Sequence, residues 1–217
     1  MKAIKLFLWR VFDVLAVMVS YGFNFKISSY ARLFRNKTYS YALGRRFQRV
    51  GPNLSIEYPA VVCGPQFIRV GDNFQSFARL RLEAFGEHGG SFYKPEIIIG
   101  NNVSMNYDCH IGCINRIVIG DNVLMGSRIL ITDHFHGEIN ADMLNTPPAQ
   151  RKITSRGPVV IEDNVWIGEG VAVMPNVRIG RNSIIGANAV VADDLPPNCV
   201  AGGVPARVIR FLTAEQR

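Results

Sequence analysis

Two of the four histidines stand one residue apart, in the segment ILITDHFHGEI at residues 129–139. Histidine has the ordinary side-chain pKa nearest to neutral, so it can take up or release a proton at physiological pH. His134 or His136 is therefore a candidate general base, and the adjacent Asp133 is placed to hold an imidazole in one tautomer. In an extended backbone both rings face the same way, so a shared metal ion is a second interpretation. Simple hydrogen bonding within a loop is a third.

A six-residue repeat organises the part of the chain that must position these histidines. This period suits neither an α-helix nor an alternating strand, and it is typical of a parallel β-helix in which three hexads form one triangular coil. We expect Ile161 to stack against Ile179, with glycine and asparagine at the turns. From Ile161 the chain reads IEDNVW, IGEGVA, VMPNVR, IGRNSI, IGANAV and VADDLP, with an aliphatic residue first in every hexad.

The repeat stops after Ile131 and resumes at Ile161. The intervening residues 132–160 are largely polar and contain prolines, so we expect them to leave the coil as an excursion loop with both histidines at its base. Long loops on rigid scaffolds usually carry binding or catalysis. Residues 84–95 interrupt the early repeat as a second loop, to which the sequence assigns no role.

The net charge of +7 is concentrated near the N-terminus. Residues 26–49 contain seven basic residues and no acidic one, so the other 17 basic residues balance the 17 acidic residues of the chain. The preceding residues are mostly apolar, but the uncharged run 14–25 is shorter than the roughly 20 residues that cross a bilayer. Residues 1–49 are interpreted as a helical extension that either lies on an anionic membrane surface or presents a solvated basic face.

Two further expectations follow from composition. The basic segment matches no nucleic-acid-binding signature, so no nucleic-acid partner is expected. The four cysteines are scattered and form no CxxC pair, which favours a reducing, cytoplasmic location over a disulfide framework.

Longer motifs lie between residues 50 and 210, namely DHFHG, GPVVIEDNVWIGE and the run NVWIGEGVAVMPNVRIGRNSIIGANAVVADDLPPNCVAGGVPARVIR. They resemble the hexapeptide-repeat acyltransferases, and most closely the bacterial O-acetyltransferases of lipopolysaccharide O-antigen and capsule. The resemblance implies an all-β fold, a left-handed parallel β-helix over residues 50–200. It also implies a C-terminal segment, 201–217, with a short helix into which Pro196, Pro197 and Pro205 turn the chain. The implied assembly is a homotrimer with active sites between subunits.

The resemblance further implies a histidine base at the start of the excursion loop, with direct attack of an acceptor hydroxyl on acetyl-coenzyme A in a ternary complex. Counting from IGDN without gaps puts His136 at that position, and a two-residue deletion puts His134 there. We prefer His134, with Asp133 or a backbone carbonyl fixing its tautomer. Zinc carbonic anhydrases of this fold have a wider histidine spacing, so no metal is expected.

Donor and acceptor residues also follow from the resemblance. Asn106 corresponds to a residue that binds sugar hydroxyls, and Tyr107 and Asp108 lie beside it. The positions expected to line acetyl-coenzyme A are Trp166, Glu169 (often a small residue in relatives), Ala187, Ala192, Asp193, Arg207 and Arg210. The alternative for Trp166 is packing against a neighbouring subunit, and the alternative for the two arginines is simple solvation.

The sequence is therefore interpreted as an acetyl-coenzyme A-dependent O-acetyltransferase acting on a hydroxyl of a bacterial surface-polysaccharide sugar or its precursor. An N-acetyltransferase of an amino sugar nucleotide is the alternative within enzymes. A non-catalytic trimeric β-helix that serves as a scaffold or binding module is the alternative from another class.

Overall fold

The computed structural model describes residues 2–138 and 143–212. Its contacts divide the chain into two compact units, Met1–Arg35 and Asn36–Arg217. Two helices come first, α1 (Lys2–Tyr21) and α2 (Phe25–Gly44). Among the described residues no single helix is long and apolar enough to span a membrane, although the two helices taken together as a bent pair pass that test of length and composition.

The second helix has a defined start and a packed end. The side chain of Asn24 caps it, because its oxygen accepts hydrogen bonds from the N–H groups of Lys26 and Ile27. Near the other end, the Ser40 hydroxyl accepts a hydrogen bond of 2.8 Å from the N–H of Ile56 in the first coil. Leu43 is buried in the core beside it. The last turns of α2 therefore cover the first coil of the repeat region, which protects an otherwise open end of the core.

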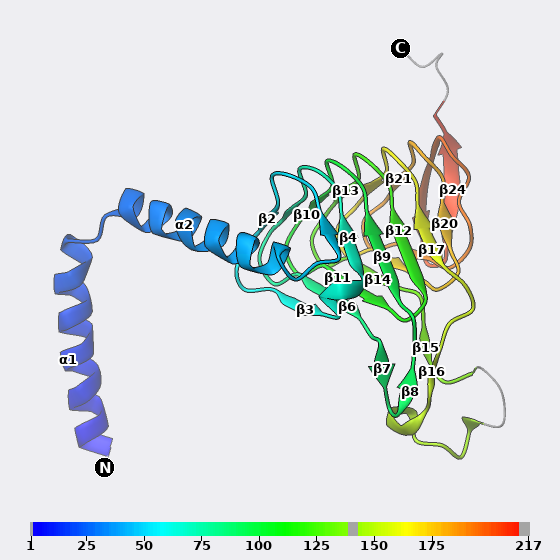
Figure 1. Cartoon of the computed structure of the whole chain (residues 1–217). Coiled ribbons are helices and arrows are strands. Elements are labelled where there is room, and N and C mark those ends of the chain that lie inside the picture. The colour runs from blue at the N-terminus through cyan, green and yellow to red at the C-terminus, as the bar shows by residue number, and fades with distance from the viewer. Residues whose placement is uncertain (1, 139–142, 213–217) are drawn as a thin grey trace. The chain divides into compact units, whose positions relative to one another are not determined.

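The repeat region is a triangular coil of short strands whose three faces are three sheets (Figure 1). The first sheet contains, in order, β1 (Arg49–Val50), β4 (Ile68–Val70), β9 (Glu96–Ile99), β12 (Arg116–Ile119), β17 (Val159–Ile161) and β20 (Arg178–Ile179). The second contains β2 (Ser55–Ile56), β5 (Gln75–Ser76), β10 (Ser104–Met105), β13 (Leu124–Met125), β18 (Trp166–Ile167), β21 (Ile184–Ile185), β23 (Cys199–Gly203) and β24 (Ala206–Phe211). The third contains β22 (Val190–Val191), β19 (Ala172–Val173), β14 (Leu130–Thr132), β11 (His110–Cys113), β6 (Arg81–Ala84) and β3 (Val61–Cys63).

The strands of the coil pair in parallel, and their register confirms the hexad prediction. Ile161 pairs with Ile179, 18 residues further along, and it also pairs with Ile119 on the other side. The aliphatic residues that open the hexads point inward and are fully buried, as Ile167 and Val173 illustrate. Burying a side chain of this kind stabilises the fold by about 1.5–3 kcal/mol, so the stacked rows supply most of the driving force for coiling.

One corner of the coil is built from a column of asparagines. Seven asparagines in successive coils all have positive φ, between 55° and 61°, a conformation that asparagine tolerates better than most residues. Each side-chain N–H₂ donates to the amide oxygen of the next at 2.8–3.1 Å, so the column is a continuous hydrogen-bonded ladder. Its members are Asn53, Asn73, Asn102, Asn122, Asn164, Asn182 and Asn198.

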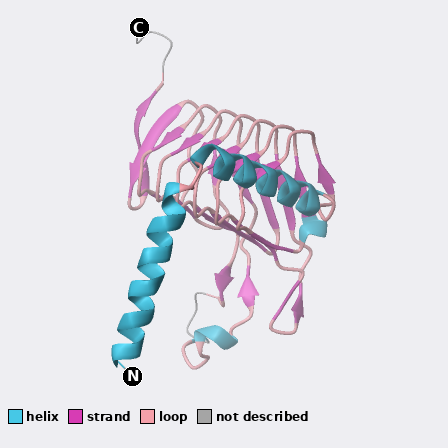
Figure 2. Cartoon of the chain, turned by 90° about the vertical axis from the view of Figure 1, so that its left-hand side faces the viewer, coloured by secondary structure: helices cyan, strands magenta, loops and turns pink. Residues whose placement is uncertain are grey.

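Two excursions leave the coil at the corner that joins the third sheet to the first. The shorter one follows β6 and contains the hairpin β7 (Glu87–His88) and β8 (Ser91–Phe92). The longer one follows β14 and contains the antiparallel pair β15 (Phe135–His136) and β16 (Ile153–Thr154), with a short 3₁₀ turn at Pro148–Gln150. Figures 1 and 2 show both projecting on the same side of the coil. The hydroxyl of Tyr93 donates a hydrogen bond of 2.9 Å to the carbonyl of Ile153, which joins them.

The prediction of a short helix in the segment 201–217 is wrong for the part of it that the structure describes. The coil continues past Pro196 and Pro197 into β23, and the chain then turns back at Pro205 into strand β24. These last two strands pair antiparallel. The run ARVIRF contains the β-branched Val208 and Ile209 and the aromatic Phe211, residue types that are enriched in strands. As the outermost strand of the second sheet, β24 covers an edge that would otherwise be open.

Candidate active site

Asp133 is a fully buried carboxylate at the root of the longer excursion. Its oxygens accept hydrogen bonds from the backbone N–H groups of Ile114 at 2.9 Å and Asn115 at 2.8 Å, and from the Cys113 thiol at 3.2 Å. Burial by itself would raise the pKa of Asp133, but the hydrogen bonds from His134 and the two amides outweigh it and hold the pKa below its usual range. Asp133 is therefore a carboxylate anion fixed in place by the turn of the neighbouring coil.

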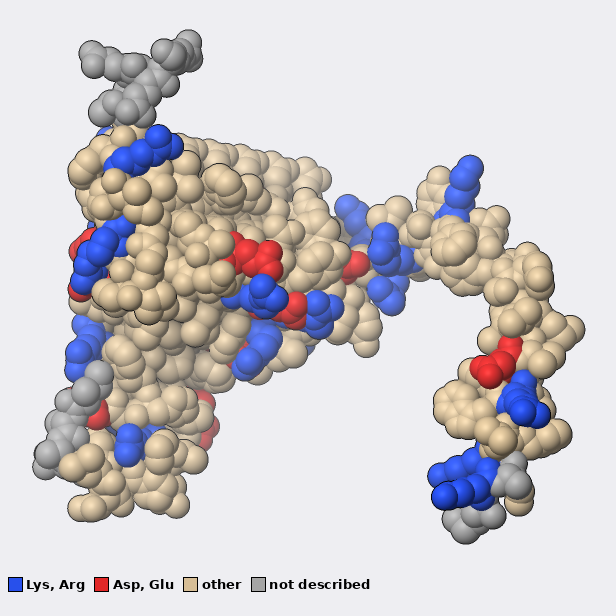
Figure 3. All heavy atoms as spheres, turned by 180° about the vertical axis from the view of Figure 1, so that it is seen from behind, with Lys and Arg blue, Asp and Glu red and all other residues tan. Residues whose placement is uncertain are grey.

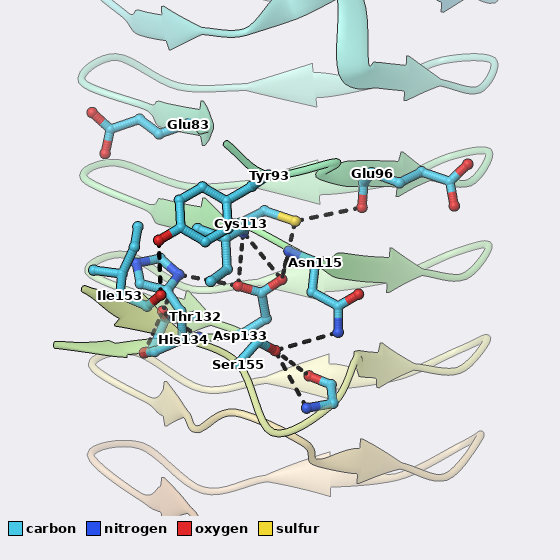
Figure 4. Close-up of polar contacts among 12 residues, drawn as sticks. Glu83, Tyr93, Glu96, Cys113, Asn115, Thr132, Asp133, His134, Ile153 and Ser155 are labelled. Carbon is cyan, nitrogen blue, oxygen red and sulfur yellow. Dashed lines mark hydrogen bonds and ion pairs between the residues drawn. The ribbon is translucent and has the colours of Figure 1, made fainter. Parts of the chain in front are cut away.

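The ring of His134 is held by this carboxylate (Figure 4). Its Nδ1 lies 3.0 Å from Oδ1 of Asp133 and 3.2 Å from the hydroxyl oxygen of Thr132, and only 12% of its side chain is exposed. Because an ionised carboxylate can only accept, Nδ1 of His134 carries the proton and donates it to Asp133. The lone pair on Nε2 is then left to act as a base. This is the geometry in which a carboxylate orients a catalytic imidazole.

His136 has different surroundings. It lies on strand β15, it is exposed, and its ring meets the ring of His88 on the shorter hairpin edge to face at 6.2 Å between centroids. Among the described residues no carboxylate is within hydrogen-bonding distance of His136. The sequence left His134 and His136 as alternatives, and the structure places only His134 against an orienting acid.

Sequence reasoning missed a second acid and imidazole pair beside the first. Glu83 on β6 has 9% of its side chain exposed, and its Oε2 lies 2.8 Å from Nε2 of His110 and 2.8 Å from the guanidinium of Arg81. Burial and the nearby Arg81 lower the pKa of His110 below its usual value. The available signal was an acidic residue at an outward position in the strand directly before the second interruption.

The acceptor residues expected from the sequence are not brought to His134 within one chain. Asn106 precedes β11 and His134 follows β14, and these strands run in parallel, so the two residues lie at opposite ends of the third sheet. A four-residue strand of this kind is about 13 Å long. Tyr107 stacks against Phe77 at 5.0 Å, and Asp108 accepts two hydrogen bonds of 2.6 Å from Arg79, which hold its pKa below the usual value.

The expected donor residues lie on the second sheet and on two corners. Trp166 is outward and 51% exposed, and it shares a row of paired residues with Ile184 and Val200 that ends at Arg210 on β24. Ala187 belongs to the turn that follows the second sheet in the next coil, where its backbone N–H packs against Gly168.

The remaining donor candidates are engaged by other side chains or follow the third sheet. The carboxylate of Glu169 lies 2.7 Å from the guanidinium of Arg128, so its side chain is turned toward that partner. Asp193, next to Ala192 at the end of β22, accepts a hydrogen bond of 2.8 Å from Arg207. Both members of this last pair are well exposed, at 66% and 63%.

Within residues 2–138 and 143–212, no group of three or more histidine, cysteine, aspartate or glutamate side chains is arranged to hold a metal ion. A metal ion shared with His136 would bind one of the two ring nitrogens of His134. One of them, Nδ1, already faces Asp133 and Thr132.

Comparisons with known proteins point to one family. Residues 158–193 match the model of the bacterial transferase hexapeptide, six repeats. WbbJ of Escherichia coli (strain K12), which is assigned as an O-acetyl transferase of lipopolysaccharide biosynthesis, is 38% identical over 166 residues, 75% of this chain and 81% of that protein. The crystal structure of a maltose O-acetyltransferase from Clostridium difficile 630 is similar with a TM-score of 0.52 and 31% identity, over 79% of this chain and 73% of that one.

A further solved structure shares the fold. It is a mutant of AntD, an N-acyltransferase from Bacillus cereus in complex with dTDP-4-amino-4,6-dideoxyglucose and coenzyme A. The TM-score is 0.62 at 21% identity, and the match covers 78% of this chain and 86% of that one.

Proposed function

The chain belongs to the family of hexapeptide-repeat transferases and is an acyltransferase, and from that premise we propose that it moves an acetyl group from acetyl-coenzyme A to a sugar hydroxyl of a bacterial surface polysaccharide or its precursor. The likeness to WbbJ over three quarters of the chain supports this acceptor class. The observation that carries the chemistry is the buried Asp133 carboxylate 3.0 Å from Nδ1 of His134. The left hand of the coil, which the family implies, is part of the proposal.

His134 is the proposed general base. Acetyl-coenzyme A, when bound, supplies the acetyl group as a thioester. A sugar hydroxyl is a poor nucleophile until its proton is being removed, and Nε2 of His134 takes that proton while Asp133 stabilises the resulting imidazolium. Such a base contributes about 10²–10⁴ in rate.

Transfer is proposed to be direct, without an acyl-enzyme. Cys109 directly precedes β11 and Cys113 ends it, and both are fully buried, whereas a thiolate is the form that attacks a thioester. Burial raises the pKa of Cys109 to about 11 and also raises that of Cys113, so both remain protonated thiols at neutral pH. Neither supplies the nucleophile that an acyl-cysteine would need.

The residues of the second sheet fit a thioester donor with a long amide arm and phosphates. The exposed indole of Trp166 offers an apolar surface for the arm. Arg210 lies three strands from Trp166 in the same row of paired residues. It forms no ion pair with any residue that the structure describes, so its guanidinium is available for phosphate. Arg207 would have to exchange its partner Asp193 for phosphate to serve in the same way.

A trimer with active sites between subunits would complete the arrangement. Hexapeptide-repeat acetyltransferases are typically trimeric and act on carbohydrates. Asn106 and His134 lie at opposite ends of the third sheet, so a neighbouring subunit is the source that we propose for the acceptor-binding asparagine beside each His134. The outward apolar side chain of Leu124, which is 46% exposed, is suited to such an interface.

The N-terminal extension is proposed to hold the enzyme at the cytoplasmic face of the membrane, where lipid-linked precursors would be within reach. Helix α1 exposes apolar side chains around its circumference, including Phe7, Trp9 and Phe12 at 65–67%. Basic residues and almost no acidic ones accompany it, as the blue spheres along the extension in Figure 3 illustrate. An apolar helix beside a basic segment is the composition of an interfacial membrane anchor.

The experiment that tests this function uses the full-length protein, radiolabelled acetyl-coenzyme A and membranes that carry lipid-linked polysaccharide precursors. We expect label in the polysaccharide, and we expect hydroxylamine to release it because an acetyl ester is cleaved. Hydroxylamine-resistant label would identify an amide and the N-acetyltransferase alternative. Failure of the protein to bind acetyl-coenzyme A at millimolar concentration by calorimetry would favour the non-catalytic scaffold.

A further inference from the structure

The buried Glu83 has no role in the mechanism above. Its Oε2 accepts hydrogen bonds from Arg81 and His110, both at 2.8 Å. Burying a carboxylate is costly, and replacing a buried ionic group by an apolar one of similar volume is often neutral or stabilising. A buried acid kept on the outward face of a β-helix strand, joined to an imidazole, is therefore a candidate functional group.

This pair lies directly beside the proposed base. Strands β6, β11 and β14 set Glu83, Gly112 and Thr132 in one row of paired residues. A methyl group placed on Gly112 would lie 3.3 Å from Cε1 of His134 and 3.5 Å from Nε2 of His110. The two imidazoles therefore both lie close to Gly112, where the lack of a side chain leaves room for them. Figure 4 shows Glu83 two coils away from the pair formed by Asp133 and His134, with the coil that contains β11 and His110 between them.

A pocket opens on the far side of His110. Its volume is about 310 Å³, at the lower end of the range for small-molecule sites, which is about 300–1,000 Å³. Arg79, Arg81, Asp108 and His110 supply its polar groups, and residues 59–61 supply an apolar wall. The pocket, the Glu83–His110 pair and His134 therefore follow one another along the outer face of the third sheet.

The hydrogen-bonding groups of the pair suit hydroxyls. A carboxylate can only accept, so Nε2 of His110 carries a proton and Nδ1 is the remaining acceptor of a neutral ring. Oε1 of Glu83 receives no hydrogen bond from any residue that the structure describes. Beside these acceptors, Arg81 offers donors. A sugar hydroxyl both donates and accepts, so this set complements it, whereas a phosphate would meet the negative charge of Glu83.

We propose that Glu83 and His110 form an acceptor subsite, which binds a hydroxyl of the sugar adjacent to the hydroxyl at His134. The subsite rests on the proposed function, because it assigns the second hydroxyl relative to the first. It would make the enzyme selective for sugars that present two neighbouring hydroxyls. The ring of Phe85 stands perpendicular to that of His134 at 6.0 Å between centroids, and it also meets the ring of His88 on the shorter hairpin at 6.2 Å.

The test uses the small number of histidines in the chain. With only four, the imidazole ¹H–¹⁵N correlations of the full-length protein can be assigned one by one, His110 by its loss in His110→Gln. Maltose, methyl β-galactopyranoside and methyl α-mannopyranoside are each titrated in the presence of coenzyme A, which prevents turnover. We expect at least one sugar to shift the His110 ring signals. Its affinity should fall about tenfold or more in Glu83→Gln, the equivalent of one lost hydrogen bond to a charged group.

Three controls separate this subsite from structure and from chemistry. His88→Gln changes a histidine on the neighbouring hairpin and should leave sugar affinity within about twofold of the parent. His134→Gln should retain sugar binding while losing transfer, so failure of the proposed base does not remove the subsite. Acetyl-coenzyme A affinity should be unchanged in Glu83→Gln if the fold is intact. The inference is overturned if no sugar in the panel shifts His110, or if Glu83→Gln binds the shifting sugar as tightly as the parent.

Discussion

At the scale of the residue, the proposed chemistry depends on the carboxylate of Asp133. It is buried, it accepts hydrogen bonds from two backbone amides and the Cys113 thiol of the preceding coil, and it also contacts Nδ1 of His134. An imidazole held in this way keeps Nε2 unprotonated and its ring orientation fixed, at no further entropic cost. His136, two residues on, is exposed and lacks such a partner among the described residues, so it lacks this orientation.

The same carboxylate predicts how stability depends on pH. The pKa of Asp133 is lower in the folded chain than its ordinary value of 3.8, so its contribution is fully present above that value and is lost as the pH falls through the folded pKa. Protonation leaves the amides of Ile114 and Asn115 without an anionic acceptor, which costs about 1–3 kcal/mol. Urea unfolding of the parent and of Asp133→Asn between pH 6 and pH 2.5 isolates the contribution of this carboxylate to the free energy of unfolding.

We expect the stability of Asp133→Asn to fall less steeply with acidification than that of the parent, because the variant has no carboxyl to protonate at this position. Asp108 and Glu162 also have lowered pKa values, but both are present in each protein and cancel in the comparison. Equal slopes in the two proteins below pH 4 would contradict the account of Asp133.

How far the sequence predicts the site depends on how local its contacts are. Asp133 and His134 are adjacent, so their pairing was accessible from the sequence alone. The choice between His134 and His136 was not, because it depends on the amides of residues 114 and 115, about 18 residues away along the chain. Glu83 was missed because its partner His110 is 27 residues distant and meets it only through the register of β6 with β11.

At the scale of the element, the asparagine corner shows how a turn and a hydrogen-bond ladder are built from one residue type. Asn122 has φ of 57°, receives a hydrogen bond of 3.0 Å from Asn102 and donates one of 3.0 Å to Asn164. Alanine in the left-handed region costs roughly 1–2 kcal/mol, and glycine is free of that cost. The ladder and the backbone conformation can therefore be separated by two substitutions.

We expect Asn122→Ala to lower the free energy of unfolding by about 1–3 kcal/mol, since it loses the ladder contacts and strains the backbone. Asn122→Gly should be less destabilised than Asn122→Ala, because it loses only the contacts. Chemical denaturation of both variants beside the parent measures the difference. If alanine and glycine were equally destabilising, positive φ would not be the reason for asparagine at this corner.

The elements also show where a repeat pattern is informative and where it is not. The hexads predict the parallel coil and the pairing of Ile161 with Ile179, because inward aliphatic residues must stack. They also locate both excursions as interruptions of the period. The prediction of a short C-terminal helix was wrong. Strand β24 is stabilised by pairing with β23 and by covering a sheet edge, and such tertiary contacts are not visible as a local period in the sequence.

At the scale of the whole molecule, the chain combines a rigid coil with an N-terminal extension of opposite character. The coil buries its apolar residues, whereas α1 exposes nearly all of its own. Large exposed apolar surfaces on a protein mark interaction with a partner or a membrane. Beside a segment with seven basic and no acidic residues, an anionic membrane surface is the partner that we propose.

Vesicle sedimentation of the full-length protein tests this proposal. We expect binding to phosphatidylcholine vesicles that contain phosphatidylglycerol, weaker binding without it, and loss of about tenfold or more in affinity on Leu8→Asp with Phe12→Asp, because two apolar side chains can no longer enter the interface. Phe92→Asp is the matched control, since it replaces an aromatic residue that is even more exposed, at 80%, on the coil's hairpin. A parent that stays in the supernatant with both vesicle types would contradict the proposal.

The measurement that tests the central claim most directly is the rate of coenzyme A release from acetyl-coenzyme A, with membranes carrying lipid-linked polysaccharide precursors, for the parent, His134→Gln and His136→Gln. We expect His134→Gln to lose about 10²–10⁴ in kcat with unchanged affinity for the donor, and His136→Gln to remain within about threefold of the parent. The reverse order, or full activity in both variants, would contradict the assignment of the Asp133–His134 pair as the catalytic base.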